Sequence, residues 1–145
     1  MTRWLLVATR VALGALFLWA ALSKLPDMEG FAQDVANYRI LPALLVPYVA
    51  AAVIGIELLA ALALISGVMA RPAALAVAGL LTAFIAFLAQ ALSRGLDLRC
   101  GCFGSDELAS WWTVVRDAAM LAAALVVARD SGRRQRVLED ERSRT

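Results

Sequence analysis

The chain has 145 residues, a formal net charge of +2 and 62% hydrophobic residues, and its mean hydropathy is +0.75. Soluble domains have only about 45–50% apolar residues, so the excess indicates a membrane protein. The small net charge gives no indication of a nucleic-acid partner, and we predict none.

Four apolar segments have the length of transmembrane helices. They are Leu5–Leu22, Val46–Val68, Pro72–Leu92 and Leu108–Ala128. Each has about the 20 residues that a helix needs to cross the hydrocarbon core of a bilayer. Four buried helices of a soluble bundle are the alternative, but too few polar residues remain for the outer faces of such helices. We therefore predict an all-α membrane protein whose residues 1–128 form a four-helix transmembrane bundle.

The basic residues predict the orientation of this bundle. An even number of spans places both termini on one side, and cytoplasmic termini leave nine basic residues inside and five outside. The positive-inside rule therefore favours cytoplasmic termini in a bacterial-type inner (plasma) membrane. The inner set is Arg3, Arg10, Arg71, Arg129, Arg133, Arg134, Arg136, Arg142 and Arg144, and the outer set is Lys24, Arg39, Arg94, Arg99 and Arg116. Residues 129–145 lack apolar periodicity, and we predict a basic, disordered cytoplasmic tail. Such a run is most often only a solvated end to the last helix, and contact with anionic lipid headgroups is the alternative.

The loop between the first two spans contains a second kind of helix. Phe31, Val35 and Tyr38 are spaced at i, i+4 and i+7, and Pro42 follows. This spacing predicts a short amphipathic helix on the extracytoplasmic surface. It acts either as a lid over the bundle or as a plain surface helix with no role in chemistry.

Several charged residues fall inside the predicted spans. Glu57 lies about 17 Å along the second span, near the bilayer centre, where an ionised side chain costs about 2.5–3.5 kcal/mol. We expect it either to be a neutral acid or to pair with Arg116 of the fourth span, with the adjacent Asp117 completing a network. Lys24 is expected to extend towards the membrane surface, on the same side as the cysteines described next. Such residues are functional by default, so Glu57 and Arg116 are candidate catalytic residues that move protons or orient a polar cofactor; a purely structural clamp is the alternative.

The cysteines of the chain are Cys100 and Cys102, in the run Arg99-Cys100-Gly101-Cys102-Phe103-Gly104. Cysteines at i and i+2 are about 7 Å apart at Cα when extended, slightly beyond the range of a disulfide. Gly101 has no Cβ and permits the tight turn that closes this gap. A disulfide in so small a ring is strained, and strained disulfides are the easily reduced ones. The spacing therefore predicts a redox-active pair.

The surroundings of this pair favour a reactive thiolate. The next span begins a few residues later, so the cysteines precede a helix N-terminus, and Arg94 and Arg99 are nearby in the sequence. Both features stabilise a thiolate, and we favour Cys100, next to Arg99, as the attacking group. Binding of copper or mercury is the alternative, because thiolates are soft ligands. The chain has no histidine, so we predict no metal site with further ligands.

Residues 10–128 resemble the MauE (methylamine-utilisation protein E) group of the DoxX-like membrane proteins. The matching residues are Arg10, Ser23-Lys24-Leu25, Phe31, Tyr38-Arg39-Ile40-Leu41-Pro42, Glu57-Leu58, Arg94-Gly95, Cys100-Gly101-Cys102-Phe103-Gly104, Trp112 and Arg116. The resemblance implies a four-helix membrane bundle that works beside thioredoxin-like proteins outside the cytoplasm. It also implies a role in maturing a disulfide-rich dehydrogenase subunit.

These observations predict a thiol–disulfide redox protein that exchanges electrons with an extracytoplasmic thioredoxin-like partner through Cys100 and Cys102. Glu57 and Arg116 would assist, with Lys24, Arg94, Arg99 and Asp117 in support. Four-helix proteins that generate disulfides use a quinone and a second cysteine pair, which this chain lacks. The missing pair weakens the analogy with these quinone-dependent proteins, and a quinone cofactor is left open. A soft-metal transporter and a non-enzymatic anchor subunit of a redox complex are the alternative functions.

Overall fold

The computed structural model describes residues 3–96 and 108–144 of the chain. Most of these residues are helical, and no strand is formed among them. The helices are α1 (Arg3–Lys24), α2 (Met28–Asn37), α3 (Val46–Ser66), α4 (Ala70–Ser93) and α5 (Trp111–Ser143), with a 3-10 turn, η1 (Leu25–Asp27), between α1 and α2. Four helical stretches, one beginning with each of α1, α3, α4 and α5, are long and apolar enough to cross a membrane. The predicted all-α, four-span architecture is therefore confirmed.

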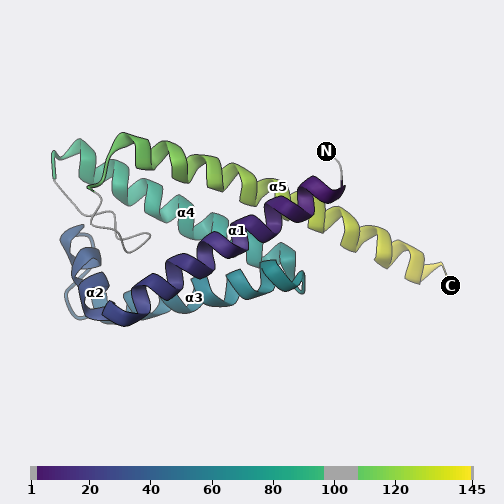
Figure 1. Ribbon diagram of the computed structural model, residues 1–145, viewed down its shortest axis with the longest axis horizontal. Coiled ribbons are helices and arrows are strands. Elements are labelled where there is room, and N and C mark those ends of the chain that lie inside the picture. Colours follow the sequence, from purple (N-terminus) through teal and green to yellow (C-terminus); the bar gives the residue numbers. More distant parts are fainter. Residues whose placement is uncertain (1–2, 97–107, 145) are drawn as a thin grey trace.

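The long helices form a bundle in which each packs against two others. α1 lies along α3, α4 lies along α5, and the contacts α3–α4 and α1–α5 close the ring. α3 and α5 are therefore diagonal to one another. Figure 1 shows both chain termini at one end of the bundle and α2 at the opposite end. We call these the terminal end and the α2 end.

Local sequence signals explain where the helices begin and end. The carboxylate of Asp27 accepts a hydrogen bond of 2.8 Å from the backbone N–H of Gly30 and so caps α2. Pro47 lies in the first turn of α3, where the missing N–H costs no helical bond. Gly67 ends α3 in the left-handed conformation at φ 80°, which glycine adopts without strain.

The amphipathic helix predicted between the first two spans is present as α2. Phe31 is buried against Ala50 and Ile54 of α3, and Val35 packs beside them. The expected periodicity thus places the apolar face of α2 on the bundle. The helix lies across the α2 end and not along the long helices (Figure 1).

The tail differs from its sequence-based expectation. α5 continues as one helix to Ser143, and its last turns project beyond the bundle at the terminal end (Figure 1). Ion pairs at i,i+4 spacing support this helix: Asp130–Arg134 and Asp140–Arg144, each at 3.1 Å. Such pairs stabilise an exposed helix that has no apolar face, which is why hydrophobic periodicity gave no sign of it.

Small residues allow α1 and α3 to approach closely. A Cβ on Gly14 would lie 2.8 Å from Ile65 Cγ1, 3.1 Å from the Ala61 carbonyl oxygen and 3.1 Å from Leu64 Cβ. Ala61 and Leu64 are fully buried in the bundle core. Helices in membranes associate largely through such close packing, because lipid is as apolar as the helix surfaces.

We expect Gly14→Ala to destabilise the bundle by about 1–3 kcal/mol, because the added methyl group has no room. Gly79→Ala is the matched control, since a Cβ there meets nothing within 4 Å. That variant should be neutral or stabilised by up to about 1 kcal/mol, as alanine favours helix over glycine. Unfolding of both variants in mixed detergent micelles checks this. Equal effects of the two changes would show that α1 and α3 are not in close contact at Gly14.

Candidate functional site

Cys100, Cys102 and Arg99 lie outside the described residues. The helices on either side of them are described: α4 ends and α5 begins at the α2 end of the bundle (Figure 1). Arg94, directly after α4, is exposed. Trp111 and Trp112, the first residues of α5, are 61% and 71% exposed, as expected for side chains at a membrane interface.

A buried ion pair joins α1 and α3. The ammonium group of Lys24 donates hydrogen bonds of 2.8 Å to both carboxylate oxygens of Glu57. Both residues are only 2% exposed. Lys24 is the last residue of α1, and helical side chains tilt towards the N-terminus of their helix. Its ammonium is therefore directed back into the bundle. The sequence-based expectation, that Lys24 extends towards the membrane surface, differs from this geometry.

The aromatic ring of Phe31 covers this ion pair from α2. The Lys24 ammonium lies 5.1 Å from the centre of the Phe31 ring, within the range of a cation–π interaction. The ammonium thus contacts a carboxylate on one side and an aromatic face on another. This arrangement satisfies a charge that is otherwise costly away from water.

The structure does not show the expected Glu57–Arg116 pair, because the described partner of Glu57 is Lys24. The described contacts of Arg116 are with its neighbour Asp117: Nη2 and Nε lie 3.2 and 3.3 Å from Asp117 Oδ1. The Arg116 side chain is 32% exposed, whereas that of Asp117 is 2% exposed. Because α3 and α5 are diagonal in the bundle, Glu57 lies nearer to a cation on α1 than to one on the outer side of α5.

Asp117 nevertheless shares a small cavity with Glu57. The cavity, with a volume of about 10 Å³, is lined from all four long helices by Phe17, Ala20, Glu57, Leu81, Phe84, Asp117 and Met120. A space of this size holds about one water molecule. Asp117 Oδ2 is buried and accepts no hydrogen bond from any residue in the described part of the chain. The cavity therefore brings a paired carboxylate, Glu57, near one that has an open acceptor oxygen.

The acidic and basic residues form one polar cluster beneath the α2 end, which is buried except for the partly exposed Arg116 and is called the buried polar cluster below. Asp117 is about 9 Å along the α5 axis from the first residue of that helix. The cluster consists of Lys24 and Glu57, covered by Phe31, and of Arg116 and Asp117 across the cavity. Two carboxylates close to a site for one water can take up and release protons, which thiol chemistry requires.

The model of the family "Methylamine utilisation protein MauE" matches residues 2–129. The chain belongs to the MauE family. Its similarity to the Methylamine utilization protein MauE of Paracoccus denitrificans is 41% identity over 124 residues, which cover 83% of this chain and 67% of the relative. The MauE protein of Paracoccus versutus is 43% identical over 121 residues, which cover 81% of this chain and 65% of the relative.

This member of the MauE family thus spans about two thirds of the length of the curated relatives it matches. No solved structure matches it. The family match includes the buried polar cluster and the cysteine run, since both fall within residues 2–129.

Sequence reasoning identified most members of the polar cluster but not their contacts. Glu57, Arg116, Asp117 and Lys24 were all predicted as site residues, whereas Phe31 was predicted only as part of an amphipathic face. One sequence signal does point to the observed pairing. Lys24 lies two residues before the helix-breaking Pro26 and directly before a short 3-10 turn, so α1 ends within reach of the bundle interior.

Proposed function

We propose that this protein is a membrane-embedded thiol–disulfide redox protein that exchanges electrons with an extracytoplasmic thioredoxin-like partner through Cys100 and Cys102. By its family, that activity would serve a methylamine utilisation system, through the maturation of a disulfide-containing enzyme subunit. The wider relationship to DoxX-like proteins is part of the same proposal. The observation that supports it best is the buried polar cluster, which lies at the end of the bundle where the cysteine segment joins α4 to α5.

The chemistry is an exchange of two electrons and two protons. The thiolate of Cys100 attacks a disulfide of the partner, and the partner's leaving thiolate takes up a proton. The thiolate of Cys102 then attacks the sulfur of Cys100 in the mixed disulfide and releases the second partner thiol. The products are a Cys100–Cys102 disulfide and a reduced partner. The reverse sequence oxidises the partner, so the relative potentials of the two pairs set the direction.

The polar cluster would act on the protons of this exchange. Each attacking thiol must lose a proton, and each leaving thiolate must gain one. In this proposal Asp117, with its open Oδ2, accepts or donates that proton through the water-sized cavity. The Lys24–Glu57 pair holds α1 against α3 and fixes the second carboxylate of the cavity.

The cavity between Glu57 and Asp117 does not fit a quinone. The cavity between Glu57 and Asp117 has room for about one water, far less than a quinone ring needs. The proposed exchange therefore has no quinone step, and the partner's cysteines exchange directly with Cys100 and Cys102.

The proposal includes an orientation with cytoplasmic termini and an extracytoplasmic cysteine segment, as the basic residues favour. A membrane-impermeant maleimide added to intact cells should therefore label Cys100 or Cys102 after treatment with an impermeant reductant. Without the reductant, labelling should be weak, because the pair would be held as a disulfide.

The matched control is a chain with Cys100→Ser and Cys102→Ser that also has Ser143→Cys. Ser143 is the exposed last residue of α5. This variant should label only after cell lysis. Labelling of the native cysteines only after lysis, together with labelling of the Ser143→Cys variant in intact cells, would reverse the orientation and remove the extracytoplasmic partner.

A further inference from the structure

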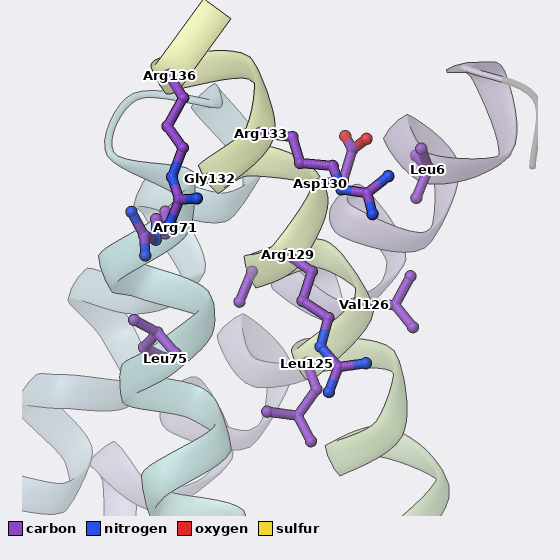
Figure 2. A pocket seen from close by; sticks show the side chains of 11 residues that line it. Leu6, Arg71, Leu75, Leu125, Val126, Arg129, Asp130, Gly132, Arg133 and Arg136 are labelled. Atoms are coloured by element: carbon purple, nitrogen blue, oxygen red, sulfur yellow. The ribbon is translucent and has the colours of Figure 1, made fainter.

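A large groove lies at the terminal end, far from the polar cluster. Its volume is about 670 Å³, and it opens between α1, α4 and α5. Leu75, Leu125 and Val126 form its apolar part. In Figure 2 the side chains of Arg71 and Arg136 come together above Leu75, Arg133 extends beside Asp130, and Arg129 extends down beside Leu125. The groove therefore has an apolar and a strongly basic region next to one another.

The basic region consists of four arginines from two helices. Arg129, Arg133 and Arg136 are spaced at i, i+4 and i+7, which places them on one face of α5. Arg71 joins them from the first turn of α4. In Figure 2 the side chains of Arg71 and Arg136 extend towards one another. Like charges that gather in this way favour an anion between them.

Gly132 allows Arg71 to reach this position. A Cβ on Gly132 would lie 3.1 Å from Arg71 Nε and 3.2 Å from Arg71 Cζ. The guanidinium group thus lies directly across the α5 backbone. A Cβ here would require a small shift of the Arg71 side chain, and a bulky side chain such as leucine would displace Arg71 from the other three arginines.

None of these four arginines forms an ion pair or hydrogen bond with another residue in the described ranges 3–96 and 108–144. Asp130 also lines the groove, but its carboxylate binds Arg134 at 3.1 Å. The groove therefore keeps a net positive charge. Guanidinium groups bind phosphate oxygens through paired, charge-assisted hydrogen bonds.

The position of the groove along α5 indicates which class of anion it binds. Arg129 lies about 27 Å along α5 from its first residue, close to the roughly 30 Å thickness of the hydrocarbon core. Arg71, Arg133 and Arg136 are therefore at the level of the lipid headgroups, and Leu75, Leu125 and Val126 are at the level of the acyl chains, with the Arg129 side chain beside Leu125 where the two levels meet. We propose that this groove binds an anionic phospholipid, with its phosphate among the four arginines and an acyl chain against Leu75, Leu125 and Val126.

Native mass spectrometry of the purified full-length protein tests this proposal. The probes are phosphatidylglycerol and phosphatidylcholine with identical acyl chains, titrated in detergent. We expect phosphatidylglycerol to bind about tenfold more tightly or better, because phosphatidylcholine has the same phosphate but also a quaternary ammonium, which the arginines repel. The double change Arg129→Gln with Arg133→Gln should weaken phosphatidylglycerol binding about tenfold or more.

Two further variants separate a specific site from general attraction. Arg142→Gln with Arg144→Gln removes the same charge about 20 Å further along α5 and should leave binding unchanged. Gly132→Leu keeps every charge but displaces Arg71, and it should weaken binding as well. Leucine favours helix over glycine, so this variant should not lose its fold, which circular dichroism checks.

Three results would overturn the proposal. Equal binding of the two lipids would show that the arginines do not select an anion. Equal losses in the two double-arginine variants would show general charge attraction. Displacement of phosphatidylglycerol by an equal concentration of inorganic phosphate would show that the groove binds the free anion and makes no use of the acyl chain.

Discussion

Glu57→Gln should lower the free energy of unfolding by about 3–5 kcal/mol, because it leaves the Lys24 ammonium buried without its counter-ion. Both oxygens of Glu57 bind that ammonium at 2.8 Å, and both residues are almost fully buried. Lys24→Met should have a similar effect, since it leaves the carboxylate unpaired. The double variant should lose far less than the sum of the two, because no unpaired charge remains.

Reversible unfolding in mixed detergent micelles measures these differences. Glu57→Gln combined with Arg116→Gln is the matched control, because the described contacts of Arg116 are with Asp117. The losses from that combination should be additive. Additive losses for Lys24 and Glu57, or strong coupling of Glu57 with Arg116, would show that the bundle interior differs from the arrangement described above.

The architecture could be predicted from the sequence because its signals are local. Apolar runs of about 20 residues defined the four spans, and i, i+4, i+7 spacing defined α2. The tail could not be predicted in the same way. Its helix depends on exposed ion pairs such as Asp130–Arg134, which leave no trace in hydropathy.

The contacts of the site were harder to predict because they depend on the order of helices around the bundle. Residue counts along the two spans predict membrane depths for Glu57 and Arg116 that differ by no more than a long side chain can reach. The packing of α1 on α3, with α5 diagonal to α3, gives Glu57 a different partner. The contact of Arg71 with Gly132 has the same origin, because two residues far apart in sequence meet only when α4 packs against α5.

Cys102→Ser should stop the proposed exchange after its first step, the formation of the mixed disulfide. Cys100 would still attack a partner disulfide, but no second thiol would be present to resolve the mixed disulfide. A covalent complex with the partner should accumulate, and turnover of the partner should stop. Cys100→Ser, the matched control with the same loss of one sulfur atom, should stop turnover without accumulating the complex.

The alternative functions predict different results for the same variants. A soft-metal transporter would form no adduct, and both cysteine variants would instead change cellular uptake of copper or mercury. A passive anchor subunit would form no adduct and show no change in metal uptake. If Cys100→Ser accumulates the complex and Cys102→Ser does not, then Cys102 is the attacking thiol and the two roles are exchanged.

The most direct test of the central claim is the mass of the species that Cys102→Ser forms in cells, isolated under non-reducing conditions. The proposed function predicts one covalent complex whose mass is the sum of this chain and a thioredoxin-like protein, and which a reductant separates into the two. A variant that stays at the mass of the chain alone, with Cys100 free to be alkylated in the presence of oxidised partner, would contradict thiol–disulfide exchange as the function of this protein.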